Sequence, residues 1–145
     1  MKAMLLNEVS DLKTNTSPLE FATIAIPELG PDELLLKIST CGVCRTELDE
    51  IEGRTPPPQF PVIPGHQVVG RVAEVRNSSS RFKIGERVGV AWIYSSCGIC
   101  KFCLSGDENL CPEFRATGRD VHGGYAQFMV IPEKSAFPIP EVFSD

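Results

Sequence analysis

The sequence predicts a mainly β fold with a few short helices and one protruding, metal-binding loop. Twelve prolines and twelve glycines divide the 145 residues into short segments, and many valine and isoleucine pairs favour short strands over long helices. Four cysteines within fifteen residues predict the metal-binding loop. The length is sufficient for one domain with its own core but too small for two large domains.

Strands are predicted where short apolar runs are separated by turn residues. The turn Gly30-Pro31-Asp32 leads into a run that becomes alternating at Leu36 and Ile38. These segments have the character of core strands, and none of them carries chemistry. We predict strands over residues 2–9, 19–26, 33–39, 68–75, 85–90 and 125–131.

A short helix and a rigid loop are predicted between the third and fourth strands. The helix covers residues 47–52, and Gly53 provides its stop. Residues 56–64 then contain five prolines, which restrict the backbone. Because Phe60, Val62 and Ile63 are mixed in with these prolines, we expect the three apolar side chains to dock the loop onto the core.

The four cysteines have the spacing C-x2-C-x2-C-x7-C, which is typical of a closed structural zinc site. Two intervening residues let neighbouring thiolates face one centre, and the seven-residue excursion brings the fourth sulfur to the open corner. Two alternatives stay open. Disulfides are less usual within an intracellular protein, and the similar ferredoxin run has a last gap of three residues rather than seven. The four members are Cys97, Cys100, Cys103 and Cys111.

The composition argues against several classes of partner. The chain has 14 basic and 19 acidic residues, a net charge of −5, whereas binding to nucleic acid needs a concentrated basic patch. Its apolar runs are far shorter than the roughly 18 residues of a membrane span, and Glu8 interrupts the start before a signal-peptide core develops. We therefore expect a cytoplasmic protein, in which thiols stay reduced and available to metal.

Cys41 and Cys44 form another C-x2-C pair, but no second pair lies nearby to complete four ligands, so this pair alone is weak evidence for a metal site. Cys44 lies just ahead of the predicted helix, where backbone N–H groups and the positive end of the dipole favour a thiolate. His66 is one of only two histidines in the chain. Simpler interpretations exist for both residue types, because buried free cysteines are common and a single histidine beside a strand is often structural.

Several short motifs follow one another along nearly the whole chain. They are Cys41-Gly42-Val43-Cys44-Arg45-Thr46, Pro64-Gly65-His66, Gly85-Glu86-Arg87-Val88, Trp92-Ile93-Tyr94, the four-cysteine loop and Gly123-Gly124-Tyr125-Ala126. Each motif alone is modest evidence, but the ordered set is highly specific. Together they resemble the N-terminal, GroES-like catalytic domain of the zinc-dependent medium-chain alcohol dehydrogenases, and most of all the bacterial small-alcohol branch. The resemblance implies a partly open β-barrel from which the zinc loop protrudes.

The resemblance assigns Cys44 and His66 as ligands of a catalytic zinc, with Cys41 as a non-ligand, and it assigns a structural zinc to the four-cysteine loop. A thiolate, an imidazole and a third protein ligand leave one position on zinc open for substrate. Zinc is a Lewis acid that lowers the pKa of an alcohol. The implied reaction is hydride transfer between a small alcohol and a nicotinamide ring, in either direction.

Three neighbouring residues also receive roles from the resemblance. Thr46 relays the alcohol proton through its hydroxyl, and Arg45 pairs with the pyrophosphate of the cofactor through its fixed guanidinium fork. Trp92 lines and narrows the substrate pocket. The simpler interpretations are that Thr46 is a turn residue, Arg45 a solvated cation and Trp92 a core side chain.

Three positions depart from the family pattern. Gln67 replaces the glutamate that usually follows the zinc-binding histidine, which removes a negative charge beside the metal and is expected to make zinc more electrophilic. Asp49 stands where a histidine commonly ends the proton relay, so a carboxylate would accept the proton instead. Glu47 replaces the aspartate that orients the ligand histidine, and keeps a carboxylate on a longer arm.

The sequence has no G-x-G-x-x-G fingerprint and no alternating βαβ pattern. We therefore expect residues 1–145 to be the GroES-like catalytic domain without its nucleotide-binding domain, and the third ligand of the catalytic zinc to lie beyond Asp145. Alone, the chain is expected to bind the structural zinc tightly and to be inactive. For the full-length protein the resemblance implies NAD or NADP, a small alcohol or aldehyde substrate, and a homo-oligomer.

Two rival functions belong to other classes. A non-enzymatic module would use the GroES-like barrel and its zinc loop for protein contacts, but such a module needs no open metal site at Cys44 and His66. An electron-transfer protein would hold an iron–sulfur cluster on the four cysteines. A colourless protein preparation would exclude this hypothesis.

Overall fold

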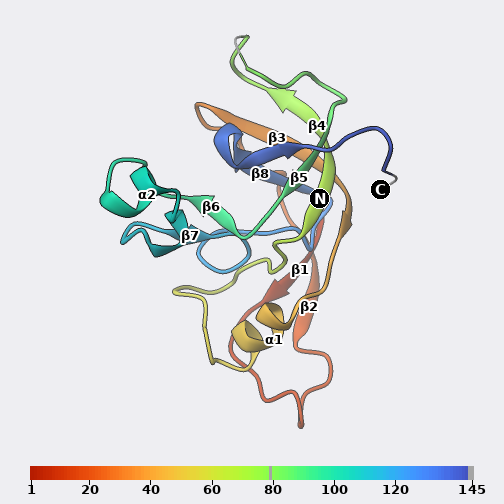
Figure 1. Ribbon diagram of the computed structural model, residues 1–145. Helices are drawn as coiled ribbons and strands as arrows, with labels where there is room; N and C mark the ends of the chain where they lie inside the picture. The colour runs from red at the N-terminus through yellow and green to blue at the C-terminus, as the bar shows by residue number, and fades with distance from the viewer. Residues whose placement is uncertain (79, 144–145) are drawn as a thin grey trace.

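A curled antiparallel sheet forms the body of the molecule in the computed structural model, which describes residues 1–78 and 80–143 (Figure 1). The sheet runs in the order β8 (Phe128–Pro132), β3 (Glu33–Cys41), β4 (Val68–Val75), β5 (Arg87–Val90) and β9 (Ala136–Pro138). Every neighbouring pair is antiparallel. This half-barrel confirms the predicted mainly β, GroES-like fold.

A small second sheet closes one side of the half-barrel. It pairs β1 (Lys2–Leu6) with β2 (Leu19–Thr23), and Met4 lies opposite Phe21. Leu6 exchanges two backbone hydrogen bonds with Val62, of 2.8 and 3.0 Å. These bonds fasten the proline-rich loop to the sheet. Val62 and Ile63 are buried there as predicted, but the expectation for Phe60 is wrong, because its side chain is 38% exposed.

The main core is built from alternate side chains of the strands of this sheet. Strand β4 shows the alternation directly, since Val68, Gly70 and Val72 are buried while Arg71 is exposed. Gly70 is required by close packing, because a Cβ there would lie 2.8 Å from the carbonyl oxygen of Lys37. The buried members of the core cluster are Leu34, Leu36, Val68, Val72, Phe82, Val88, Val90, Met129, Ile131 and Ala136.

Two short α-helices interrupt the strands. Helix α1 (Arg45–Ile51) follows Cys44, and Gly53 adopts a positive φ of 76° just after its end, as the predicted stop requires. Helix α2 (Lys101–Ser105) and the 3-10 turn η1 (Glu108–Leu110) lie in the four-cysteine loop. This loop stands away from the sheet at the left of Figure 1. It is carried by β6 (Ile93–Ser95) and β7 (Arg115–Ala116).

The element boundaries differ from the sequence predictions mainly at strand ends. The strand over 68–75 has the predicted bounds. The first two strands are shorter than predicted, β3 extends to Cys41, and the strand expected over 125–131 begins only at Phe128. Helix α1 begins two residues earlier than predicted. The short strands β6, β7 and β9 and the turn η2 (Glu133–Ser135) lack a periodic sequence signal and were not predicted.

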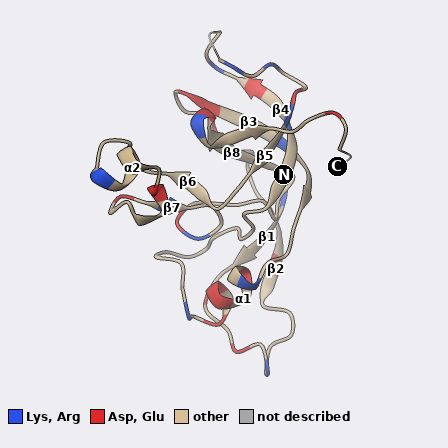
Figure 2. Cartoon of the chain, in the orientation of Figure 1, with Lys and Arg blue, Asp and Glu red and all other residues tan. Residues whose placement is uncertain are grey.

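Charged side chains are distributed over many elements. Figure 2 shows Lys and Arg dispersed along the chain and interspersed with Asp and Glu. Within the described residues, no helix is long and apolar enough to cross a membrane. The expectations about nucleic acid, membrane and compartment stay predictions.

Candidate functional site

The carboxylate of Glu47 connects the two predicted catalytic-zinc ligands. Its Oε2 accepts a hydrogen bond of 2.7 Å from the backbone N–H of Cys44, and its Oε1 lies 2.8 Å from Nδ1 of His66. The side chains of Glu47 and His66 are both almost fully buried. One carboxylate therefore fixes the start of α1 and the ring of His66 at the same time.

The contact with Glu47 determines which ring nitrogen of His66 is available. A carboxylate facing Nδ1 favours a proton on that nitrogen and leaves the lone pair of Nε2 for a ligand bond. Histidine ligands of zinc characteristically have such a partner on the nitrogen that faces away from the metal. This arrangement fits a catalytic zinc on His66, in the role that the sequence resemblance implies.

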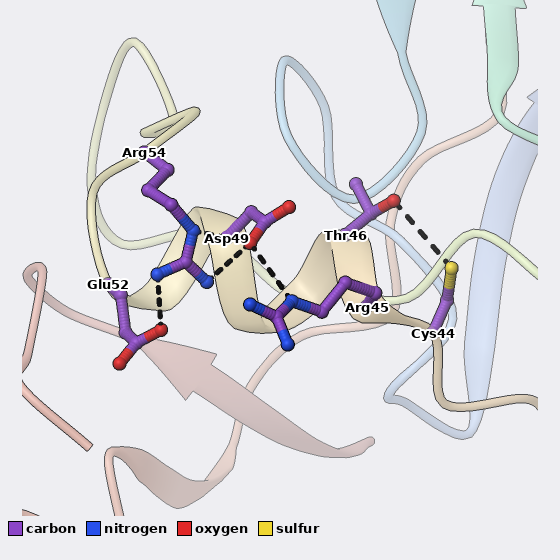
Figure 3. Close-up of polar contacts among 6 residues, drawn as sticks. All are labelled: Cys44, Arg45, Thr46, Asp49, Glu52 and Arg54. Atoms are coloured by element: carbon purple, nitrogen blue, oxygen red, sulfur yellow. Dashed lines mark hydrogen bonds and ion pairs between the residues drawn. The ribbon is translucent and has the colours of Figure 1, made fainter. Parts of the chain in front are cut away.

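Cys44 and Thr46 lie together at the first turn of α1. The Sγ of Cys44 is 3.6 Å from the Oγ1 of Thr46 (Figure 3). Both side chains are half-buried, so a thiolate and a hydroxyl share one small site that remains accessible. A hydroxyl in this place can accept a proton on one side and donate one on the other.

Cys41 has a different environment, although it belongs to the same C-x2-C pair. Burial is the main cause that raises the pKa of its thiol to about 11. Its sulfur lies under two glycines, because a Cβ added to either Gly65 or Gly124 would come within 2.9 Å of it. A protonated thiol enclosed in this way is a packing group. The predicted non-ligand role of Cys41 agrees with this environment but has no direct test.

Asp49 and Arg45 take part in a surface network of ion pairs. Oδ1 of Asp49 accepts hydrogen bonds from Nε of Arg54 at 2.5 Å and from Nε of Arg45 at 3.4 Å, while Nη1 of Arg54 lies 2.6 Å from Oε2 of Glu52 (Figure 3). The hydrogen bond from Arg54 is the main cause that lowers the pKa of Asp49. Figure 3 shows Asp49 turned toward the guanidinium groups and Thr46 turned toward Cys44. The predicted roles of Asp49 in a proton relay and of Arg45 in phosphate binding stay predictions.

Trp92 and Gln67 lie at more exposed positions. The indole of Trp92 is 37% exposed and packs against Phe114, with ring centroids 4.9 Å apart. Gln67 is exposed, and its backbone carbonyl oxygen accepts a 2.8 Å hydrogen bond from the N–H of Gly42. An exposed Trp92 is not a core side chain, and its predicted role beside the substrate stays a prediction.

The four cysteines of the protruding loop converge on one point. All four Sγ atoms lie within 4.8 Å of one another, and Cys103 is 3.6 Å from Cys100 and 3.9 Å from Cys97. Sulfurs at about 2.3 Å from a tetrahedral zinc are about 3.8 Å apart, whereas disulfide sulfurs are about 2.05 Å apart. The separations therefore fit four thiolates around one ion and do not fit two disulfides.

Backbone N–H groups prepare this loop for negative charge. The N–H of Cys100 donates to Sγ of Cys97 at 3.4 Å, and the N–H of Cys97 donates to Sγ of Cys111 at 3.4 Å. The N–H groups of Ile99 and then of Cys100 are the main causes that lower the pKa of Cys97 to about 7, whereas the pKa of Cys111 is raised to about 11. The cluster thus fits a structural zinc, as the sequence predicts.

Cys44 and His66 form a smaller donor set than the loop. Among the described residues, the four cysteines are the only convergent group of three or more Cys, His, Asp or Glu side chains with metal-ligand spacing. The pair at α1 therefore has no third ligand of these types within the described part of the chain. The expectation of a third ligand beyond Asp145 stays a prediction.

Sequence reasoning missed one buried acid near the site. Glu50 is fully buried on α1, one helical turn after Glu47. A signal was present, since residues three apart share one face of a helix. Glutamate is nevertheless so rarely buried without a partner that the usual expectation is an exposed side chain.

The half-barrel and the four-thiolate loop agree with the GroES-like fold and the structural zinc site that the sequence predicts. The sequence profile of the alcohol dehydrogenase GroES-like domain matches residues 30–141, so the chain belongs to that family. The protein named "Probable alcohol dehydrogenase AdhA" of Mycobacterium tuberculosis is 46% identical over 136 residues, which are 90% of this chain and 39% of that protein.

Two solved structures have the same fold. A crystal structure of an NAD-dependent alcohol dehydrogenase has a TM-score of 0.89 and 29% identity, over 99% of this chain and 41% of that one. A cobalt- and zinc-bound thermostable alcohol dehydrogenase from Pyrobaculum aerophilum has a TM-score of 0.84 and 27% identity, over 95% of this chain and 41% of that one. The chain thus spans about two fifths of the length of these proteins.

Proposed function

We propose that this chain is the substrate- and zinc-binding domain of an NAD(P)-dependent alcohol dehydrogenase. The observation that carries the proposal is the double contact of Glu47, which directs one oxygen to His66 and the other to the N–H of Cys44. A purely structural carboxylate has no need to lie against the ring of a buried histidine and at the same time to bind the backbone N–H of a half-buried cysteine. Membership of the family and the zinc-bound relative support the same function.

Each residue of the site has a distinct task in this proposal. Sγ of Cys44 and Nε2 of His66 would hold zinc, which when bound supplies a Lewis acid that lowers the pKa of an alcohol. Thr46 takes the proton of the alcohol at Oγ1 and passes on its own. Glu47 keeps His66 in the tautomer that leaves Nε2 free. Arg45, whose side chain is 74% exposed, is available to pair with the pyrophosphate of the cofactor.

The substrate class follows from the same arrangement. The hydroxyl of a small alcohol would contact Thr46, and its apolar carbon chain would pack against aromatic side chains. Trp92 and Phe114, whose rings are in contact, offer such a surface. The oxidised product is an aldehyde or ketone, and the hydride passes to NAD or NADP. We further propose that the full-length protein is a homo-oligomer, as the resemblance implies.

A kinetic assay of the full-length gene product tests this function. The wild type is expected to reduce NAD(P) in the presence of small primary or secondary alcohols. Cys44→Ser is expected to lower kcat/KM at least a thousandfold, because the loss of a metal ligand removes the electrophile on which the reaction depends. Glu52→Gln, which removes a carboxylate just after the end of the same helix, serves as the matched control and should retain activity. An unchanged rate in Cys44→Ser would refute the proposal.

A further inference from the structure

Helix α1 buries two carboxyl groups on one face. Glu47 and Glu50 are three positions apart, so their side chains lie on the same side of the helix. Both are almost completely inaccessible, with exposures of 1% and 0%. Oε2 of Glu47 accepts a hydrogen bond from the N–H of Cys44, and its Oε1 lies 2.8 Å from Nδ1 of His66. Neither oxygen of Glu50 makes a hydrogen bond within the described part of the chain.

The carboxyl group of Glu50 has no hydrogen-bond partner in the described part of the chain. Both of its oxygens are buried and unpaired. Near it on the same helix are the acids Glu47 and Asp49, and from the segment that follows β7 come Arg119 and Asp120. The hydroxyl oxygen of Tyr125 is also buried and has no hydrogen-bond partner among the described residues, and the charge of Glu50 is one of the causes that raise the pKa of this phenol.

Arg119 is the one cation among these neighbours, and it is already paired with Asp120. Nε and Nη2 of Arg119 lie 3.1 and 2.8 Å from the two carboxylate oxygens of Asp120. A carboxylate at Glu50 would thus be repelled most by the charge of Glu47 and less by Asp120 and Asp49, while the nearby Arg119 is already paired with Asp120. A buried charge without a partner is so costly that the group takes up a proton instead. Burial, followed by the charge of Glu47, raises the pKa of Glu50 to about 8.

We propose that Glu50 is a positioning residue for the Cys44–His66 site: as a buried, uncharged carboxylic acid it leaves Glu47 as the only negative charge on the inner face of α1. The role in catalysis rests on the proposed function, whereas the protonation of Glu50 does not. When Glu50 loses its proton, two like charges share one helix face at low dielectric, and both carboxylates are driven toward water. The contact between Glu47 and His66 is then lost, which sets an alkaline limit for the site.

Two NMR titrations of the zinc-loaded protein test this proposal without measuring activity. The first follows the side-chain carboxyl carbon of Glu50 between about pH 4 and pH 10 and should show it ionising well above the ordinary value of about 4.3. The second follows the ring nitrogens of His66. In the wild type they should shift in step with Glu50, in Glu50→Gln this alkaline step should be absent, and in the control Glu52→Gln it should persist.

Either of two results overturns the proposal. Ionisation of Glu50 at an ordinary carboxyl pH would show that the buried group is charged. A raised ionisation with no matching change at His66, or with the same change in Glu50→Gln, would reduce Glu50 to a packing residue. Because the carboxyl carbon can be assigned through its own backbone, the first titration remains decisive even when Glu50→Gln fails to fold. Loss of activity in Cys44→Ser, in contrast, reports only on the proposed function.

Discussion

Glu47 shows how much a single residue of the site could be predicted. The sequence places it three residues after Cys44, and the family resemblance suggested that it orients the ligand histidine. The structure places Oε1 of Glu47 2.8 Å from Nδ1 of His66 and adds a hydrogen bond from the N–H of Cys44, while the orienting role itself stays a prediction. Glu50 could not be predicted in the same way, because its burial depends on how α1 packs against the segment that contains Arg119 and Asp120.

Replacement of Glu47 tests its connecting role. Glu47→Gln retains the shape of the side chain but removes the charge that holds His66 in one tautomer. We expect the affinity of the Cys44–His66 site for zinc in the full-length protein to fall by about 10- to 100-fold, the usual cost of losing a carboxylate behind a histidine ligand. Competition with a chelator measures this affinity, and equal affinities for Glu47→Gln and wild type would contradict the role.

Asp49 gives a prediction about pH. Because the hydrogen bond from Arg54 lowers the pKa of Asp49, Asp49 stays charged at neutral pH. The stability that this pairing contributes is present above the unfolded pKa of about 3.9, and it is lost as the pH falls through the lower pKa of the folded state. We expect the pH–rate curve of the full-length enzyme to lack an imidazole-like step near neutrality. A step near pH 6.5 that survives in Asp49→Asn would show that Asp49 does not end the proton relay.

At the scale of elements, strong periodicity and glycine positions were predictable, whereas short pairings were not. Strand β4 matched its predicted bounds because five of its eight residues are valine or glycine, and its few polar residues lie between apolar ones. Strand β9 lies between prolines and has only three residues, and it forms because β5 offers it a free edge. No local sequence signal encodes such an edge.

The turn that delivers His66 to β4 can be tested through two glycines. Gly65 and Gly85 both have positive φ, 98° and 90°, but a Cβ on Gly65 would lie 2.7 Å from Tyr125, whereas Gly85 has open space. We expect Gly65→Ala to destabilise the fold by about 2–4 kcal/mol and Gly85→Ala by about 1 kcal/mol. Denaturant unfolding of both variants measures the difference, and equal losses would show that close packing at Gly65 is unimportant.

For the whole molecule, the order of motifs along the chain was the strongest guide. It predicted the half-barrel, the protruding four-cysteine loop and the family, because each motif marks a place where the backbone or a metal allows little variation. The order of motifs could not predict how charges are arranged inside the molecule, because Glu50 and Arg119 are distant in sequence and come together only in the fold. The division of zinc between two sites is the central claim at this scale.

Metal analysis of the chain and of the full-length protein tests that claim most directly. We predict one tightly bound zinc per chain here, lost in Cys103→Ser and retained in Cys44→Ser. In the full-length protein we predict two zinc ions, of which Cys44→Ser removes one and with it the oxidation of alcohol. Retention of both ions and of activity in Cys44→Ser would contradict the assignment of Cys44 and His66 as the catalytic zinc ligands.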